Sequence, residues 1–90
     1  MSYQFNATKT FWENFYALSP SQKESTRRAW EIFKTDPFDA RLRPYKIHSL
    51  SARYKRIIHS VTIEGDLRVV FLVEGNIITS LDIGKHAIYR

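Results

Sequence analysis

The spacing of hydrophobic residues changes about halfway along the chain. Between Thr10 and Thr35 they recur every three or four positions, which predicts helices. Thr10 and Glu13 have the spacing of a capping box, in which a threonine hydroxyl and a glutamate carboxylate bind free backbone N–H groups. An apolar stripe follows, made of Phe11, Trp12, Phe15 and Leu18. The pattern predicts a first helix of about ten residues that begins at Thr10.

A second helix is predicted to begin after Ser19. Ser19 suits the N-cap, Pro20 suits the first helical position, and Gln22 completes a second capping box. The helix is expected to end near Thr35, because the residue before Pro37 disfavours helical backbone. Since the link between the two helices is short, they are expected to form a helical hairpin.

Beyond residue 44 the hydrophobic period shortens to about two, which is typical of strands. Four strands are predicted, at 45–50, 55–63, 67–73 and 77–83. The last three are joined by the glycine-containing segments 64–66 and 74–76, which suit antiparallel hairpins. Residues 2–6 are a weaker candidate for a first strand.

The strand at 55–63 has two different faces. Its core face is predicted to carry Ile57, His59, Val61 and Ile63, and its outward face Arg56, Ile58, Ser60 and Thr62. The helical hairpin must bury its apolar stripe against one face of the sheet. The sequence therefore predicts an α+β fold, with an N-terminal helical hairpin packed on one face of a small antiparallel β-sheet of about four strands. The other face is expected to be partly open and to carry the function.

Composition narrows the chemistry. Ninety residues fit a single domain, residues 1–90, and 43% hydrophobic residues suffice for a core. The chain has no cysteine, which excludes disulfides, thiolate nucleophiles and cysteine-based zinc sites. Neither a membrane-spanning run nor a secretory signal is apparent, so we expect a cytoplasmic protein with no membrane partner. Phosphate-loop motifs and metal-ligand spacing are also missing from the sequence, so we expect no cofactor and no metal.

The net charge of +5 is unevenly distributed. From Arg41 to Ile63 there are six Lys or Arg residues and not one Asp or Glu. A stretch of one sign is the pattern expected for phosphate contacts, although a solvated basic surface explains it equally well.

The C-terminal half, GDLRVVFLVEGNIITSLDIGKHAIYR, resembles toxins of the RelE/ParE superfamily. The resemblance rests on a strand pair joined by a turn, on Arg68 at the head of the next strand, and on a closing G-x-H-x-x-Y motif at 84–89. It implies the toxin of a type II toxin-antitoxin system, a free monomer that forms a hetero-oligomer with its cognate antitoxin. In the RelE branch it further implies a ribosome-dependent, metal-independent endoribonuclease (an mRNA interferase) that cleaves messenger RNA in the A site.

The resemblance also implies the site residues. Attack of a ribose 2′-OH on the adjacent phosphate needs a base, cations for the developing charge and an acid for the leaving group. Arg68, His86 and Tyr89 are the candidate catalytic residues. The candidate RNA-binding residues are Lys46, Arg53, Lys55, Arg56 and Lys85.

Two features leave the function open. RelE-type nucleases tend to carry lysines on the outward face of the first long strand, where this chain has Ser60 and Thr62, and Glu64 is a weak substitute as a base. His59 is expected to be a buried, hydrogen-bonded core residue, but a slip of one residue would turn it to the active face. The alternatives are a ParE-like inhibitor of DNA gyrase without nuclease activity and a degenerate, non-toxic relative.

Overall fold

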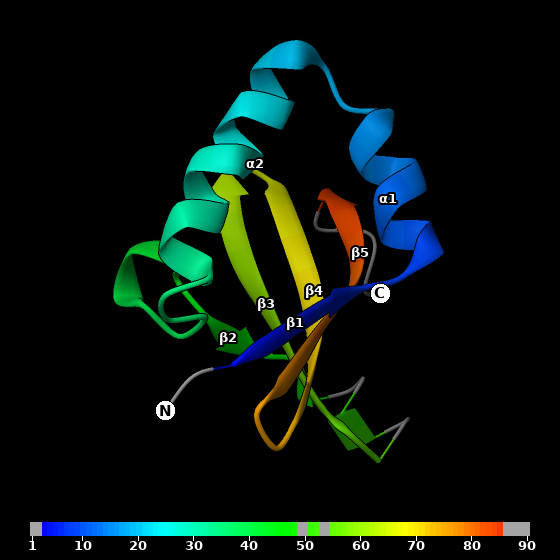
Figure 1. Cartoon of the computed structure of the whole chain (residues 1–90), viewed down its shortest axis with the longest axis vertical. Coiled ribbons are helices and arrows are strands. Elements are labelled where there is room, and N and C mark those ends of the chain that lie inside the picture. The colour runs from blue at the N-terminus through cyan, green and yellow to red at the C-terminus, as the bar shows by residue number, and fades with distance from the viewer. Residues whose placement is uncertain (1–2, 49–50, 53–54, 86–90) are drawn as a thin grey trace.

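One five-stranded sheet, in the order β1-β5-β4-β3-β2, forms the centre of the molecule (Figure 1). The structure is a computed structural model that describes residues 3–48, 51–52 and 55–85. Its elements are, in chain order, β1 (Gln4–Ala7), α1 (Lys9–Tyr16), α2 (Pro20–Phe33), a short 3-10 helix η1 (Ala40–Leu42), β2 (Tyr45–Lys46), β3 (Ile57–Glu64), β4 (Leu67–Glu74) and β5 (Ile77–Lys85). The predicted α+β class is confirmed, with five strands instead of about four.

The sheet is mixed, where an antiparallel sheet was predicted. β3, β4 and β5 form the expected antiparallel meander, whereas β1 pairs in parallel with β5, Gln4 opposite Ile77 and Ala7 opposite Ser80. Phe5 anchors this edge strand through ring contacts with Trp30 and Phe33 of α2. The weak alternation at residues 2–6 thus marks a genuine strand, whose direction follows from long-range packing.

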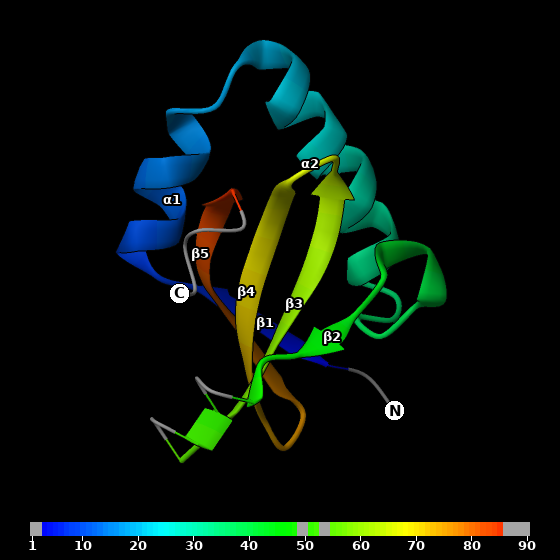
Figure 2. The ribbon, with the colours of Figure 1, turned by 180° about the vertical axis from the view of Figure 1, so that it is seen from behind.

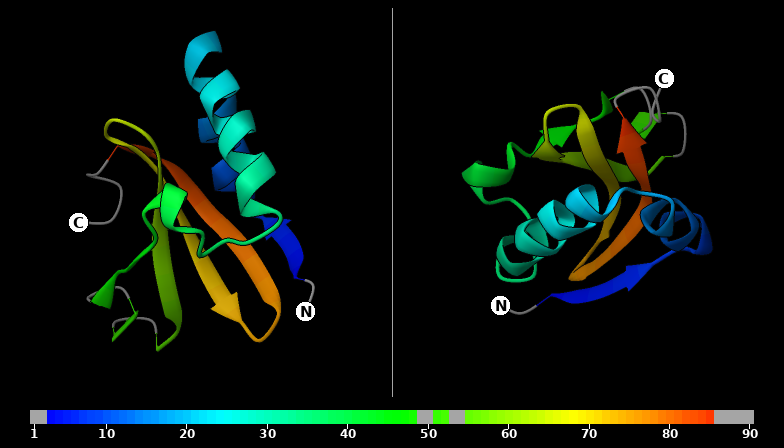
Figure 3. Two further views of the ribbon diagram at one scale, coloured as in Figure 1. Left: turned by 90° about the vertical axis from the view of Figure 1, so that its left-hand side faces the viewer. Right: turned by 90° about the horizontal axis from the view of Figure 1, so that it is seen from above.

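Both helices lie on the same side of the sheet (Figure 3, left). They are joined by a short link, as predicted, but they diverge: α1 packs along β5, and α2 packs over β3 (Figure 1). The Ser19 capping box is confirmed, with Gln22 N donating to Ser19 Oγ at 3.1 Å and Ser19 N to Gln22 Oε1 at 3.1 Å.

The predicted cap of α1 is wrong. Thr8, not Thr10, is the N-cap, and its hydroxyl accepts the backbone N–H of Phe11 at 3.1 Å. Thr8 is fixed there because its own hydroxyl donates to the carbonyl of Leu81 at 2.7 Å. The helix therefore begins where the chain leaves β1, beside β5, and it has eight residues.

The predicted strand 45–50 is also wrong at Ile47 and His48, and residues 49 and 50 lie outside the described residues. The chain turns at Ile47, which is buried and whose backbone N–H donates to the carbonyl of Ile58 at 2.8 Å. His48, Ser51 and Ala52 are helical. Ile47 therefore does not continue β2, and its side chain packs on the sheet against Ile58 and Val70.

The two faces of the sheet carry separate apolar clusters. The larger lies between helices and sheet, around fully buried Phe71, with Phe11, Phe33, Val61 and Ile78 among its members. The smaller one lies on the opposite face and consists of buried Ile47, Ile58 and Val70 with partly buried Leu72 and Leu81. The face expected to be open is therefore partly covered, and Figure 2 shows that face with β2 and the following segment near its lower end.

Candidate functional site

Arg68 is the second residue of β4, close to the β3–β4 turn. It pairs with Thr62 of β3 and Gly84 of β5, and it shares its face with Val70 of the smaller cluster. Its neighbours Leu67 and Val69 belong to the larger cluster on the helix side. Arg68 therefore lies on the face opposite the helices, as the alternation of the strand predicts.

The guanidinium of Arg68 has one protein partner among the described residues. Its Nη1 donates to the hydroxyl of Thr62 at 2.6 Å, while its Nε is buried and has no hydrogen-bond acceptor. Asp82 of the neighbouring strand β5 is the carboxylate that could compete for Arg68. Asp82 instead accepts the side-chain amide of Asn14 at 2.6 Å and the backbone N–H of Ile83 at 2.8 Å. In the described part of the chain no carboxylate pairs with Arg68.

The two outward hydroxyls of β3 differ in access. Ser60 is only 1% exposed, and it lies between paired strands, opposite Tyr45 of β2 and Val70 of β4. Thr62 is half-buried, and β2 pairs with β3 only as far as Ser60. Only Thr62 can therefore act together with Arg68 on a bound molecule.

Glu64 does not join this site. The register shifts after Thr62, so that Glu64 lies opposite Leu67, a residue of the helix side. Its carboxylate is thus turned away from the face that carries Arg68. Glu64 is therefore a poorer candidate for a general base beside Arg68 than the sequence suggested.

Most of the predicted RNA-binding residues lie elsewhere. Lys46, Lys55 and Arg56 line an open cavity of about 470 Å³ together with His48, Ser51, Ala52 and Ile57. Arg56 also forms an ion pair of 3.0 Å with Glu74. At about 3.3 Å per residue, the six positions from Arg56 to Thr62 separate this cavity from Arg68 by about 20 Å.

Lys85 is turned to the helix side, because it pairs with Leu67. Arg53, His86 and Tyr89 lie outside the described residues. The structure thus places Arg68 next to Thr62. From the sequence, Thr62 was notable only as a position where RelE-type nucleases tend to carry a lysine. Their adjacency follows from the short β3–β4 turn, which makes Thr62 and Arg68 cross-strand neighbours.

His59 faces the core side, so the predicted register is correct. Its ring stacks on Phe71, with 5.6 Å between ring centroids, and meets the edge of Phe38 at 5.2 Å. The predicted hydrogen bond is absent among the described residues, where buried Nδ1 has no partner. Burial, helped by the positive charge of Lys46, lowers the pKa of His59 below its usual value. His59 is a half-buried residue on the helix side of the sheet and is not part of the Arg68 site.

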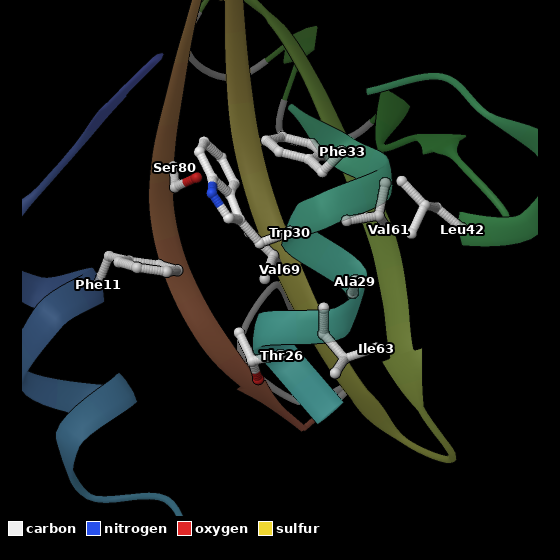
Figure 4. A pocket seen from close by; sticks show the side chains of 10 residues that line it. All are labelled: Phe11, Thr26, Ala29, Trp30, Phe33, Leu42, Val61, Ile63, Val69 and Ser80. Carbon is white, nitrogen blue, oxygen red and sulfur yellow. The ribbon is translucent and has the colours of Figure 1, made fainter. Parts of the chain in front are cut away.

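A second hollow was not predicted. The divergence of α1 and α2 leaves an apolar groove of about 270 Å³, continuous with a narrower cavity beneath α2 that Figure 4 shows in close-up. In this view Phe11 and Trp30 point into the cavity from the two helices, with Ser80 of β5 beside them. Trp12 and Trp30, which line this groove, remain 45% and 39% exposed. The sequence predicted that the helical hairpin would bury its apolar stripe against the sheet.

Residues 3–48, 51–52 and 55–85 contain no group of His, Cys, Asp and Glu arranged to hold a metal ion. None of the helices described is long and apolar enough to span a membrane.

The architecture defines a class: a small α+β domain with two diverging helices on one face of a five-stranded mixed sheet. Comparison with solved structures identifies its fold as that of RelE-like toxins. The chain is similar to a chain of the archaeal RelE-RelB complex from Pyrococcus horikoshii, with a TM-score of 0.73, 14% identity, and coverage of 98% of this chain and 99% of that chain. It is also similar to a copper-bound mutant toxin from Helicobacter pylori, with a TM-score of 0.65, 20% identity and 97% coverage of both chains. No family model matches the sequence, and no curated protein matches it.

Proposed function

We propose that this protein is the toxin of a type II toxin-antitoxin system and acts as a ribosome-dependent endoribonuclease on messenger RNA in the A site. The observation that carries the proposal is the Arg68 guanidinium, held on the helix-free face of the sheet by Thr62 and without a carboxylate partner in the described part of the chain. A permanently charged planar donor in that state is suited to phosphate oxygens.

In the proposed reaction the ribose 2′-oxygen attacks the adjacent phosphorus, and the bond from phosphorus to the 5′-oxygen breaks. Arg68 stabilises the negative charge that develops on the non-bridging oxygens. His86 exchanges protons with the 2′-hydroxyl or the leaving 5′-oxygen, as an imidazole can near neutral pH. Tyr89 stacks on a base or donates to the phosphate. These residues need no metal ion.

The partners follow from the same proposal. Lys46, Lys55 and Arg56, with Arg53 and Lys85, contact the backbone of messenger or ribosomal RNA. A cognate antitoxin binds the free toxin, which is a cytoplasmic monomer in its absence. The archaeal structure of the same fold was determined as a RelE-RelB complex, which supports a protein partner of this kind.

A second candidate is a ParE-like inhibitor of DNA gyrase without nuclease activity. The observation that favours it is the outward face of β3, where Ser60 is buried and Thr62 is the accessible residue. A cationic base on that strand is therefore lacking. A degenerate, non-toxic relative is the third reading.

Primer extension on translating ribosomes tests the proposal. We expect new messenger RNA ends at the A site with the wild-type protein, and loss of these ends with Arg68→Ala and with His86→Ala. Arg28→Ala, a change in an exposed arginine of α2, is the control. Undiminished cleavage by both variants would remove the residue assignment. Inhibition of gyrase supercoiling with intact messenger RNA would establish the second candidate, and harmless overexpression of folded protein the third.

A further inference from the structure

We infer that Thr62 is the positioning residue of Arg68: its hydroxyl fixes the Nη1 arm of the guanidinium and thereby directs the Nη2 arm toward a phosphate group. This inference deepens the proposed function and rests on it for the identity of the substrate. Thr62 itself is not a catalytic residue in this account, because it acts through the arginine.

This role of Thr62 depends on which nitrogen atoms of Arg68 already have a hydrogen-bond acceptor. Of the three nitrogens, Nη1 donates to Thr62 Oγ1 at 2.6 Å, and Nε is buried, with no acceptor among the described residues. Burial keeps Nε out of reach of a bound molecule. Because Thr62 holds Nη1, Nη2 is the arm that remains for an external acceptor.

The surroundings favour an anion as that acceptor. A hydrogen bond between a charged guanidinium and a charged phosphate oxygen is stronger than one between neutral groups. Asp82, the carboxylate that could compete from β5, is held by Asn14. Val70, next to Arg68 on the same face of β4, is buried, so this part of the face is shielded from water.

The hydroxyl suits its position for a second reason. The threonine oxygen is an acceptor of the kind that an Arg68 N–H requires. Its branched Cβ also restricts the side chain to few rotamers within a strand. Thr62 thus limits where the guanidinium can point, and a valine of the same shape would keep the strand but lose the acceptor.

The test uses 15N-labelled full-length protein and inorganic phosphate as the probe. The Arg68 Nε–H resonance is assigned by its absence from Arg68→Lys, and its shift is followed as phosphate is added. The variants are Thr62→Val, which lacks the hydroxyl, and Thr62→Ser, which retains it. Thr79→Val is the matched control, because Thr79 is a half-buried threonine on β5 whose cross-strand neighbour is Leu72.

We expect Thr62→Val to bind phosphate about tenfold more weakly at Arg68, the loss of one hydrogen bond to a charged group. Thr62→Ser and Thr79→Val should stay within about threefold of the wild type, well below the effect of losing that bond. In the ribosome assay Thr62→Val should lower the single-turnover cleavage rate, and Thr62→Ser should restore it. Equal phosphate binding by wild type and Thr62→Val, or failure of serine to restore it, would overturn the inference.

The two proposals fail in different ways. If wild-type protein leaves messenger RNA intact while phosphate binding at Arg68 depends on the Thr62 hydroxyl, the positioning role stands and the nuclease proposal falls. If messenger RNA is cleaved by wild type and Thr62→Val alike, the nuclease proposal stands and the positioning role falls.

Discussion

Replacing Arg68 by methionine should separate activity from stability. Methionine keeps an unbranched apolar stem beside Val70 and removes the guanidinium. The change deletes the hydrogen bond to Thr62 and, with it, the buried Nε that has no acceptor. If Arg68 mainly supports folding, its loss should lower the free energy of unfolding. If Arg68 mainly supports phosphate chemistry, its loss should lower the cleavage rate.

The expected magnitudes follow from these two atoms. Loss of the hydrogen bond to Thr62 costs about 1.5 to 3 kcal/mol at most, and less here because Thr62 is half-buried and can bind water. Removing a buried donor without an acceptor returns about 1 to 3 kcal/mol. The two contributions oppose each other, so the free energy of unfolding should change by about 1 kcal/mol or less. Loss of a preorganised donor to a developing oxyanion lowers a rate by about 10² to 10³.

Urea unfolding and single-turnover cleavage on ribosomes are the two assays. Arg28→Met is the control, since Arg28 lies on α2 in an exposed 3.7 Å ion pair with Glu24, which is worth little. It should leave both quantities nearly unchanged. A loss of more than about 2 kcal/mol in Arg68→Met, at an unchanged cleavage rate, would refute the reasoning and make Arg68 a structural residue.

Three further predictions concern the core, the pH dependence and the basic cavity. Phe71→Ala should lower the free energy of unfolding by about 3 to 5 kcal/mol in urea titrations, because the ring is fully buried against Phe33 and Phe38; a loss below about 1 kcal/mol would contradict that packing. Since the pKa of His59 is lower in the folded protein than the unfolded value of 6.5, the unfolded state binds more protons as the pH falls. The contribution of His59 to the free energy of unfolding is therefore fully present above pH 6.5 and is lost as the pH falls through the pKa of the folded protein. His59→Phe should flatten the curve of unfolding free energy against pH, and an unchanged curve would contradict this role of His59. The double change of Lys46 and Lys55 to alanine should weaken binding to single-stranded RNA and reduce the slope of log affinity against log salt by about 1.4, whereas an unaltered slope would mean that these lysines do not contact phosphate.

Local patterns in the sequence predicted the elements whose causes are local. The Ser19 capping box and the meander β3–β5 depend on neighbouring residues and on short glycine turns, and both are confirmed. Thr10 was chosen as a cap for the same local reason, but the hydroxyl that binds β5 belongs to Thr8. The direction of β1 depends likewise on a strand some 70 residues away, with Gln4 opposite Ile77. Periodicity within a window does not contain that information.

The candidate site shows the same division. Strand alternation correctly put Arg68 on the face opposite Val69, and the short turn made Thr62 its neighbour. The burial of Ser60 could not be predicted from the alternation within β3, because Ser60 has paired strands on both sides, with Tyr45 of β2 and Val70 of β4 opposite it.

The alternation of side chains along a strand also explains why a continuous run of basic residues does not form one continuous surface. Residues 41–63 are uniformly basic in sequence, yet the chain passes through a 3-10 helix, two strands and a helical segment over that stretch. Lys85 and Arg68 lie near each other on adjacent strands, but Lys85 is opposite Leu67 and Arg68 is opposite Gly84. Their side chains therefore face opposite sides of the sheet. Arg56 shares the outward parity of Thr62, but about 20 Å of strand separates the two. An RNA strand that reaches both Arg68 and the basic cavity would therefore have to extend along the length of β3, so substitutions at the two ends should affect binding and cleavage separately.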